Sequence, residues 1–181
     1  MSNQVFTKLN ELDLTLFYGT SNVVLAAVAP LYTITKAGLG TAAAKATHIF
    51  THSAEDAAND GTFTINTITG ANAITVVEAL TANADDDSIV IHGEWQSAWH
   101  RVDFYSRIVG PVVSDQDVSL ITDWSPVAGI TGMSSVTTAI TGGTPLSHTA
   151  EILAPYVRFR IRNNDTSLAT VTGCLYAKAL T

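Results

Sequence analysis

The stretch "YVRFRIR", residues 156–162, decides the fold class of this chain. Apolar residues alternate with arginines along it, and successive residues of a β-strand point to opposite faces of a sheet. The apolar face consists of Val157, Phe159 and Ile161. The opposite face consists of Arg158, Arg160 and Arg162. This period of two is typical of a half-buried strand with one face on a core.

Similar strand-forming stretches fill the C-terminal half of the chain. They cover residues 97–109, 117–125 and 169–180, and they are separated by loops with Gly and Pro such as "TGGTPLS". Several long strands joined by long connections indicate two packed sheets. We therefore predict an all-β chain in which residues 97–181 form an antiparallel β-sandwich of jelly-roll or Greek-key type.

Shorter strands are expected in residues 36–96. The stretch "NDGTFTINTITGANAITVVEALT", residues 59–81, opens with a tight turn at Asn59–Gly61 and then alternates apolar and polar side chains. With "IVIHGEW" at residues 89–95 it indicates three successive antiparallel strands. Such a meander is too small to be stable alone. We expect it to curl into a small β-barrel-like unit.

Residues 1–35 are expected to form an N-terminal arm or strand pair. The leucines at 12, 14 and 16 alternate with other residues, and residues 23–34 are strongly apolar. That run is shorter than the roughly 20 residues that cross a bilayer, and Pro30 interrupts it. Exposed apolar strands promote aggregation unless they are covered. We therefore expect a neighbouring subunit or a larger assembly to cover this segment.

The composition limits the function classes. Only 14% of the residues are charged, and the nine Lys and Arg residues are dispersed in a chain of net charge -7. Nucleic-acid binding needs clustered basic residues, so it is not expected. The single Cys174 cannot form an internal disulfide, and the first ten residues do not resemble a signal peptide. Synthesis in a cytoplasm is expected, with no membrane partner.

Few residues have a pattern typical of catalysis or metal binding. No serine lies in a G-x-S-x-G motif, and His48 and His52 have no third ligand at a suitable spacing. We expect no enzyme activity, no metal and no cofactor. A small hydrolase with Glu94 and either Asp103 or Asp123 as its acid and base is the weakest alternative, because such a pair needs a shared cleft.

Six residues are candidates for a ligand site or an interface: Trp95, Trp99, Tyr105, Arg158, Arg160 and Arg162. The three aromatic residues lie on one face if residues 95–105 form one extended strand, and they would then stack on a sugar ring or fill an interface. The three arginines are expected on a solvated or intersubunit face rather than in an anion site, which needs converging donors.

Two stretches resemble structural proteins of tailed bacteriophages. The first is residues 59–81 with the acidic loop and "SIVIHG" after it, which is similar to a small β-barrel module of virion proteins. The second is "APYVRFRIRNNDTSLATVTGCLYAKAL", residues 154–180, which is similar to the closing strands of virion β-sandwiches. Together they cover about two thirds of the chain.

This resemblance implies a virion protein without catalytic residues, made in the host cytoplasm. Its expected role is to decorate or cement a capsid shell. The expected partners are the chain itself, as a homo-oligomer and most simply a trimer, and the major capsid protein or other virion proteins. The alternatives are a tail component, or a glycan-binding adhesin that uses Trp95, Trp99 and Tyr105.

Overall fold

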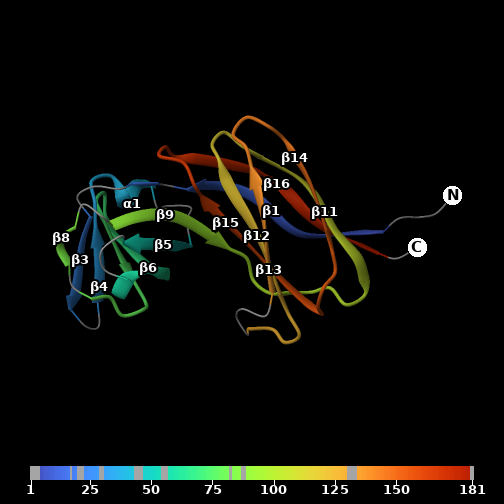
Figure 1. The fold of residues 1–181 in the computed structure, drawn as a ribbon, viewed down its shortest axis with the longest axis horizontal. Coiled ribbons are helices and arrows are strands. Elements are labelled where there is room, and N and C mark those ends of the chain that lie inside the picture. The colour runs from blue at the N-terminus through green and yellow to red at the C-terminus, as the bar shows by residue number, and fades with distance from the viewer. Residues whose placement is uncertain are drawn as a thin grey trace. The chain divides into compact units, whose positions relative to one another are not determined.

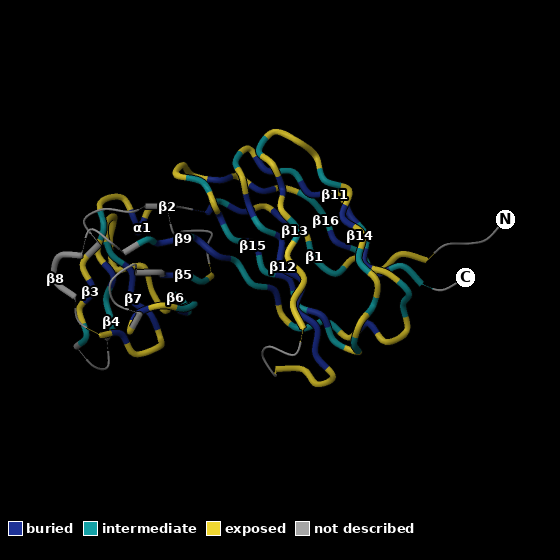
Figure 2. The backbone as a smooth tube through the Cα atoms, in the orientation of Figure 1, coloured by how far each residue is buried: buried dark blue, intermediate teal, exposed yellow. Residues whose placement is uncertain are grey.

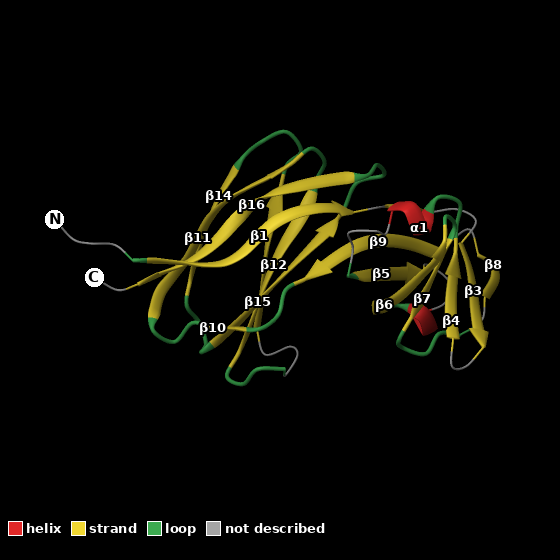
Figure 3. Cartoon of the chain, turned by 180° about the vertical axis from the view of Figure 1, so that it is seen from behind, coloured by secondary structure: helices red, strands yellow, loops and turns green. Residues whose placement is uncertain are grey.

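The structure is a computed structural model. It describes residues 5–16, 18–19, 23–28, 31–42, 47–53, 57–81, 83–86, 89–129 and 134–179. Their regular secondary structure is nearly all antiparallel strand, with a short helix α1 (Leu39–Ala42) and a 3-10 turn η2 (Ala57–Asn59) (Figure 3). The predicted all-β class is confirmed.

The chain divides into two compact units. The first, the sandwich unit, comprises residues 1–14, 96–161 and 170–181. The second, the inserted unit, comprises residues 15–95 and 162–169. The sandwich unit contains most or all of eight strands: β1 (Phe6–Leu16), β10 (His100–Arg101), β11 (Tyr105–Ser114), β12 (Val118–Ser125), β13 (Ser134–Ile140), β14 (Leu146–Glu151), β15 (Tyr156–Asn163) and β16 (Ala169–Ala179).

The eight strands have the connectivity of a jelly roll (Figure 1 and Figure 3). One sheet has the order β1-β16-β11-β14, and the other contains β13-β12-β15 with β10 paired to β15. Along the chain, the hairpin β12-β13 is thus nested inside the pair β11-β14. That pair is nested inside β10-β15, which in turn is nested inside β1-β16. This nesting of two Greek keys defines the jelly roll. The sandwich of jelly-roll type predicted for the C-terminal half is confirmed, and it also uses β1.

Alternating side chains form the core of the sandwich unit. Val157, Phe159 and Ile161 are fully buried, as "YVRFRIR" predicts. Neighbouring strands bury Ile108, Val112, Leu120 and Trp124. Figure 2 shows the buried residues along the strands and the exposed residues mainly in the loops and along β13. The period of two in the sequence therefore places these side chains correctly.

The inserted unit lies, in the chain, between the first two strands of the jelly roll. Its strands are β2 (Tyr18–Gly19), β3 (Val23–Val28), β4 (Leu31–Thr35), β5 (His48–Ser53), β6 (Gly61–Gly70), β7 (Ala73–Val76), β8 (Asn83–Asp86) and β9 (Ile89–Gln96). The order β9-β5-β6-β7-β4-β3-β8 does not close on itself among the described strands. The predicted curled meander is thus an open sheet rather than a closed barrel, and β6 bends so that its first half pairs with β5 and its second half with β7.

The described part of residues 1–35 belongs to both units. Leu12 and Leu14 of β1 are 2% and 5% exposed, and Leu25 and Ile34 lie in the apolar core of the inserted unit. The chain's own cores therefore cover these side chains. The expectation that they need a neighbouring subunit is wrong, because β1 joins β16 in a sheet instead of extending as an arm.

Candidate functional site

The outer face of β15 holds a compact ion-pair cluster around Asp123 of the adjacent strand β12. Arg158 Nη2 and Arg160 Nε both lie 2.8 Å from Asp123 Oδ2, and Arg160 Nη2 lies 3.0 Å from Oδ1. Ser135 of β13 donates a hydrogen bond of 2.7 Å to Oδ1. We call these four residues the Asp123 cluster. The Asp123 side chain is 3% exposed, so its charge is balanced almost entirely by protein groups.

The electrostatics of this cluster keep Asp123 ionised. Burial raises the pKa of its carboxyl group, but hydrogen bonds from Arg160, Ser135 and Arg158 outweigh burial and hold the pKa below its ordinary value. Such a carboxylate is a poor proton donor at neutral pH.

The other two carboxylates of the hydrolase hypothesis are also paired with arginines. Glu94, which is fully buried, lies 2.7 Å from Arg162, and Asp103 lies 2.7 Å from Arg101. Each of the three carboxylates therefore has an arginine of the chain as its partner.

The sequence suggested a solvated face for the three arginines of "YVRFRIR", but the structure places them largely away from solvent. Their side chains are 15%, 17% and 20% exposed, in ion pairs within the chain. The guanidinium carbon of Arg162 also lies 3.6 Å from the centroid of the Phe50 ring. The sequence signal for the pairing of Arg158 and Arg160 with Asp123 is that aspartate in "LITDWS", because an aspartate within an apolar strand requires a cationic partner.

The three candidate aromatic residues do not lie on one strand. Strand β9 ends at Gln96, so Trp99 lies in the segment before β10, and Tyr105 begins β11 in the other sheet. Trp99 is half-buried, with the Arg158 guanidinium carbon 4.9 Å from a ring centroid. The Tyr105 hydroxyl donates a hydrogen bond of 2.9 Å to Thr7. Trp95, also half-buried, belongs to the inserted unit. The extended platform assumed from the sequence is therefore wrong.

Four large apolar side chains are exposed where β1 begins and β16 ends: Val5, Phe6, Phe104 and Leu153, with exposed fractions of 56%, 49%, 72% and 57%. The main chain draws these segments together. The Ala179 amide donates to the Val5 carbonyl, and Ala179 pairs with Tyr105, next to Phe104. The Val102 amide donates to the carbonyl of Pro155, which closes the loop that holds Leu153. We call these four residues the apolar end.

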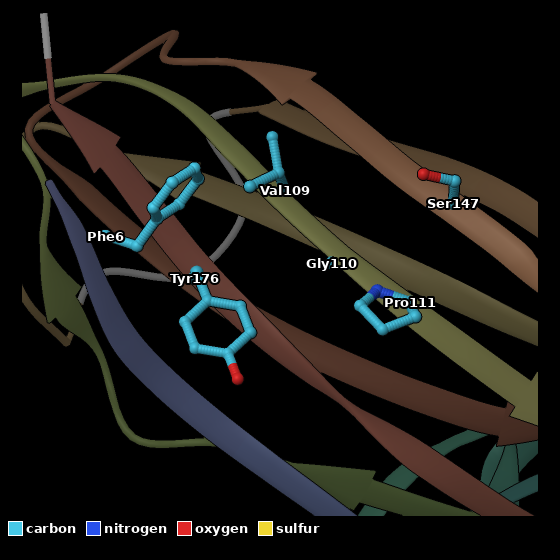
Figure 4. Close-up of a pocket in the computed structure, with 6 residues that line it drawn as sticks. All are labelled: Phe6, Val109, Gly110, Pro111, Ser147 and Tyr176. Atoms are coloured by element: carbon cyan, nitrogen blue, oxygen red, sulfur yellow. The ribbon is translucent and has the colours of Figure 1, made fainter. Parts of the chain in front are cut away.

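A hollow of about 480 Å³ adjoins the apolar end through Phe6 (Figure 4). Its lining comes from all four strands of one sheet: Phe6, Val109, Gly110, Pro111, Ser147 and Tyr176. This surface was not predicted from the sequence. The signal was the unbroken apolar run "IVGPVV" at residues 108–113, because a strand that is apolar on both faces needs cover on both.

Two histidines of the sandwich unit predict a pH-dependent stability. Burial lowers the pKa of His148 and of His100, and Nε2 of each is buried without a hydrogen-bond partner among the described residues. Their unfolded-state pKa is near 6.5, so the unfolded chain takes up protons first as the pH falls, and stability decreases below about pH 6.5. The thermal unfolding midpoint should therefore fall between pH 7.5 and 5.0.

The matched variant for this experiment is His148→Gln, which cannot take up a proton. Its midpoint should vary less over the same pH range. Asp123 affects stability at lower pH. Its contribution to the free energy of unfolding is present above its ordinary pKa of 3.8 and is lost as the pH falls through the lower pKa of the folded state. An unchanged pH dependence in His148→Gln would contradict the assignment.

Within the described ranges, no three His, Cys, Asp or Glu side chains are placed to hold a metal ion, and no helix there is long and apolar enough to span a membrane. The side chain of His52 lies outside the described part. Comparison of the chain with protein-family models and with curated proteins finds no match.

Proposed function

We propose that this chain is a structural component of a bacteriophage virion, a decoration protein that binds the capsid shell and stabilises it without catalysing a reaction. The resemblance of residues 59–93 and 154–180 to virion proteins supports this role, as does the jelly roll, a fold of viral capsid domains and also of lectins and cupins. Because one fold serves many functions, the observation that carries the proposal is the apolar end.

The apolar end has the chemistry of a protein contact. Phe104 is 72% exposed at a loop, and three further large apolar side chains are exposed on segments that main-chain hydrogen bonds draw together. Apolar surface gains roughly 25 cal/mol for each Å² removed from water, and aromatic residues are enriched at the centres of interfaces. The low charge of the chain is compatible with the same role, and the charged groups placed at these rings are Arg101, 5.2 Å from the Phe104 ring centroid, and Lys178, 6.0 Å from the Phe6 ring centroid.

The proposed partners are the major capsid protein, or another virion protein, and further copies of the chain. A tail component would use the same chemistry, and binding to isolated heads or tails separates the two. The glycan-binding alternative has lost its main support, because Trp95, Trp99 and Tyr105 do not share one strand. We therefore place the binding surface at the apolar end.

The test is co-sedimentation with purified empty heads and with purified tails of the phage that encodes the chain. The wild-type protein should sediment with heads, and Phe104→Ser should weaken binding at least tenfold, as expected for an aromatic side chain at the centre of an interface. Val127→Ser is the matched control, because Val127 is 52% exposed in the same unit but outside the apolar end.

Binding to tails alone would replace the decoration role with a tail role. No binding to either particle would contradict the proposal. Equal loss in the Phe104 and Val127 variants would show that the apolar end is not the contact.

A further inference from the structure

Strand β13 is an open sheet edge. It pairs with β12 from Val118 opposite Ile140 to Trp124 opposite Ser134, and it has no strand on its other side in the part of the chain that the structure describes. Most of its seven residues are exposed (Figure 2). An edge of this kind presents unpaired backbone N–H and C=O groups that can pair with another strand.

The other ends of the two sheets carry residues that hinder such pairing. Strand β1 carries Lys8, Glu11 and Asp13, β14 follows Pro145 and ends at Glu151, and β8 ends in two aspartates. Charged residues and proline are the usual protection of natural edges. The sequence of β13 is "SSVTTAI", without charge, proline or glycine. It is the one unprotected end among these four.

The charge distribution favours a second copy of this chain as the strand that binds there. Each copy carries a net charge of -7, so two copies repel unless their contact avoids charged residues. No Asp, Glu, Lys or Arg lies between Asp123 and Glu151, and β13 is at the centre of this stretch. Asp123 itself is neutralised by Arg158 and Arg160. An edge-to-edge contact at β13 therefore brings two uncharged strands together.

We propose that β13 pairs antiparallel with β13 of a second copy about a two-fold axis at Thr137, which extends the β13-β12-β15 sheet across the dimer. In this register Thr137 faces its counterpart and Val136 faces Thr138. Paired threonines stabilise antiparallel strands, and no like charges meet. The contact is isologous, with the same strand used by both copies. It also shields Val136, which is 43% exposed in the single chain.

This interface deepens the self-association in the proposed function, and it predicts a two-fold dimer instead of the trimer expected from the sequence. The biological role of the dimer rests on the proposed virion function, but the existence of the β13 interface does not. Its test uses the isolated protein without shells, so its failure and a failure of shell binding give different results.

The experiment is light scattering coupled to size-exclusion chromatography, over a range of protein concentrations, on the full chain. The wild type should be a dimer. Thr137→Lys and Thr137→Glu should each raise the dimer dissociation constant about 100-fold, because each places like charges opposite each other at an interface. An equimolar mixture of the two variants should restore the dimer by pairing Lys with Glu, which a folding defect would not do.

Thr149→Lys is the matched control, because Thr149 is an exposed threonine on the edge strand β14. This variant should remain a dimer. A monomeric wild type, or a wild-type oligomer of another size, would overturn the proposal. Failure of the mixture to associate would overturn it as well.

Discussion

Replacing Asp123 with Asn should lower the free energy of unfolding by about 3–5 kcal/mol, the usual cost of removing one partner from a buried ion pair. The wild-type carboxylate serves Arg158 and Arg160 at once, and their side chains are only 15% and 17% exposed. The asparagine variant leaves two positive charges close together and largely removed from water. The lost attraction between Asp123 and the two arginines is the smaller part of this effect. The larger part is the cost of leaving the arginine charges buried without a counter-ion.

Urea denaturation measures the effect, and Asp103→Asn is the matched control. Asp103 forms an ion pair of similar length, 2.7 Å against 2.8 Å, but with the largely exposed Arg101. Exposed ion pairs contribute little to stability, so this variant should unfold close to the wild type. A triple variant with Asp123→Leu, Arg158→Met and Arg160→Met should recover most of the loss, because replacing a whole buried cluster by apolar residues removes the unpaired charges. A wild-type stability in Asp123→Asn would contradict the account.

Replacing Gly110 with Ala should have an effect at least as large, about 4 kcal/mol or more, because backbone strain and disrupted packing are among the few causes of such losses. A Cβ atom at Gly110 would lie 1.9 Å from the Cys174 carbonyl oxygen of the neighbouring strand β16. The obstacle is backbone, so no side chain can move aside. The pairing of β11 with β16, at the centre of a jelly-roll sheet, has to shift.

The matched control is Gly70→Ala, also in a strand, where a Cβ atom would meet nothing within 4 Å. Calorimetric unfolding of the two variants separates the clash from the general effect of changing glycine to alanine. Gly70→Ala should keep the wild-type midpoint, while Gly110→Ala should unfold at a much lower temperature or fail to fold. Equal midpoints in the two variants would show that the sheet tolerates the added methyl group.

The local features of the fold were predictable from the sequence. Alternation in "YVRFRIR" predicts which side chains of β15 are buried, because the period of two acts within one strand. The division of the chain into two units was harder to predict from the sequence. Strand β1 pairs with β16, and residues 162–169 join the inserted unit, through contacts between residues far apart in the sequence. No local pattern records which distant strand a strand will join.

The candidate site was predictable only in part. The sequence singled out the three arginines, but it does not show that Asp123 and Glu94 lie opposite them. That pairing depends on the register between neighbouring strands. The aromatic platform failed because periodicity assumes a continuous strand, and β9 ends at Gln96. The apolar end was missed because its four residues come from three separate segments of the chain.

The pairing of the first jelly-roll strand with the last has a consequence for how the protein folds during synthesis. Among the described strands, β1 (Phe6–Leu16) is synthesised first and its partner β16 (Ala169–Ala179) last. Contacts between such distant residues slow folding. Most of the inserted unit is a continuous segment, residues 15–95, and its buried core residues all lie between Leu25 and Ile91, so this core can form before the jelly roll closes. We therefore expect a nascent chain that ends before residue 169 to protect the inserted unit from proteolysis while β1 is still cleaved.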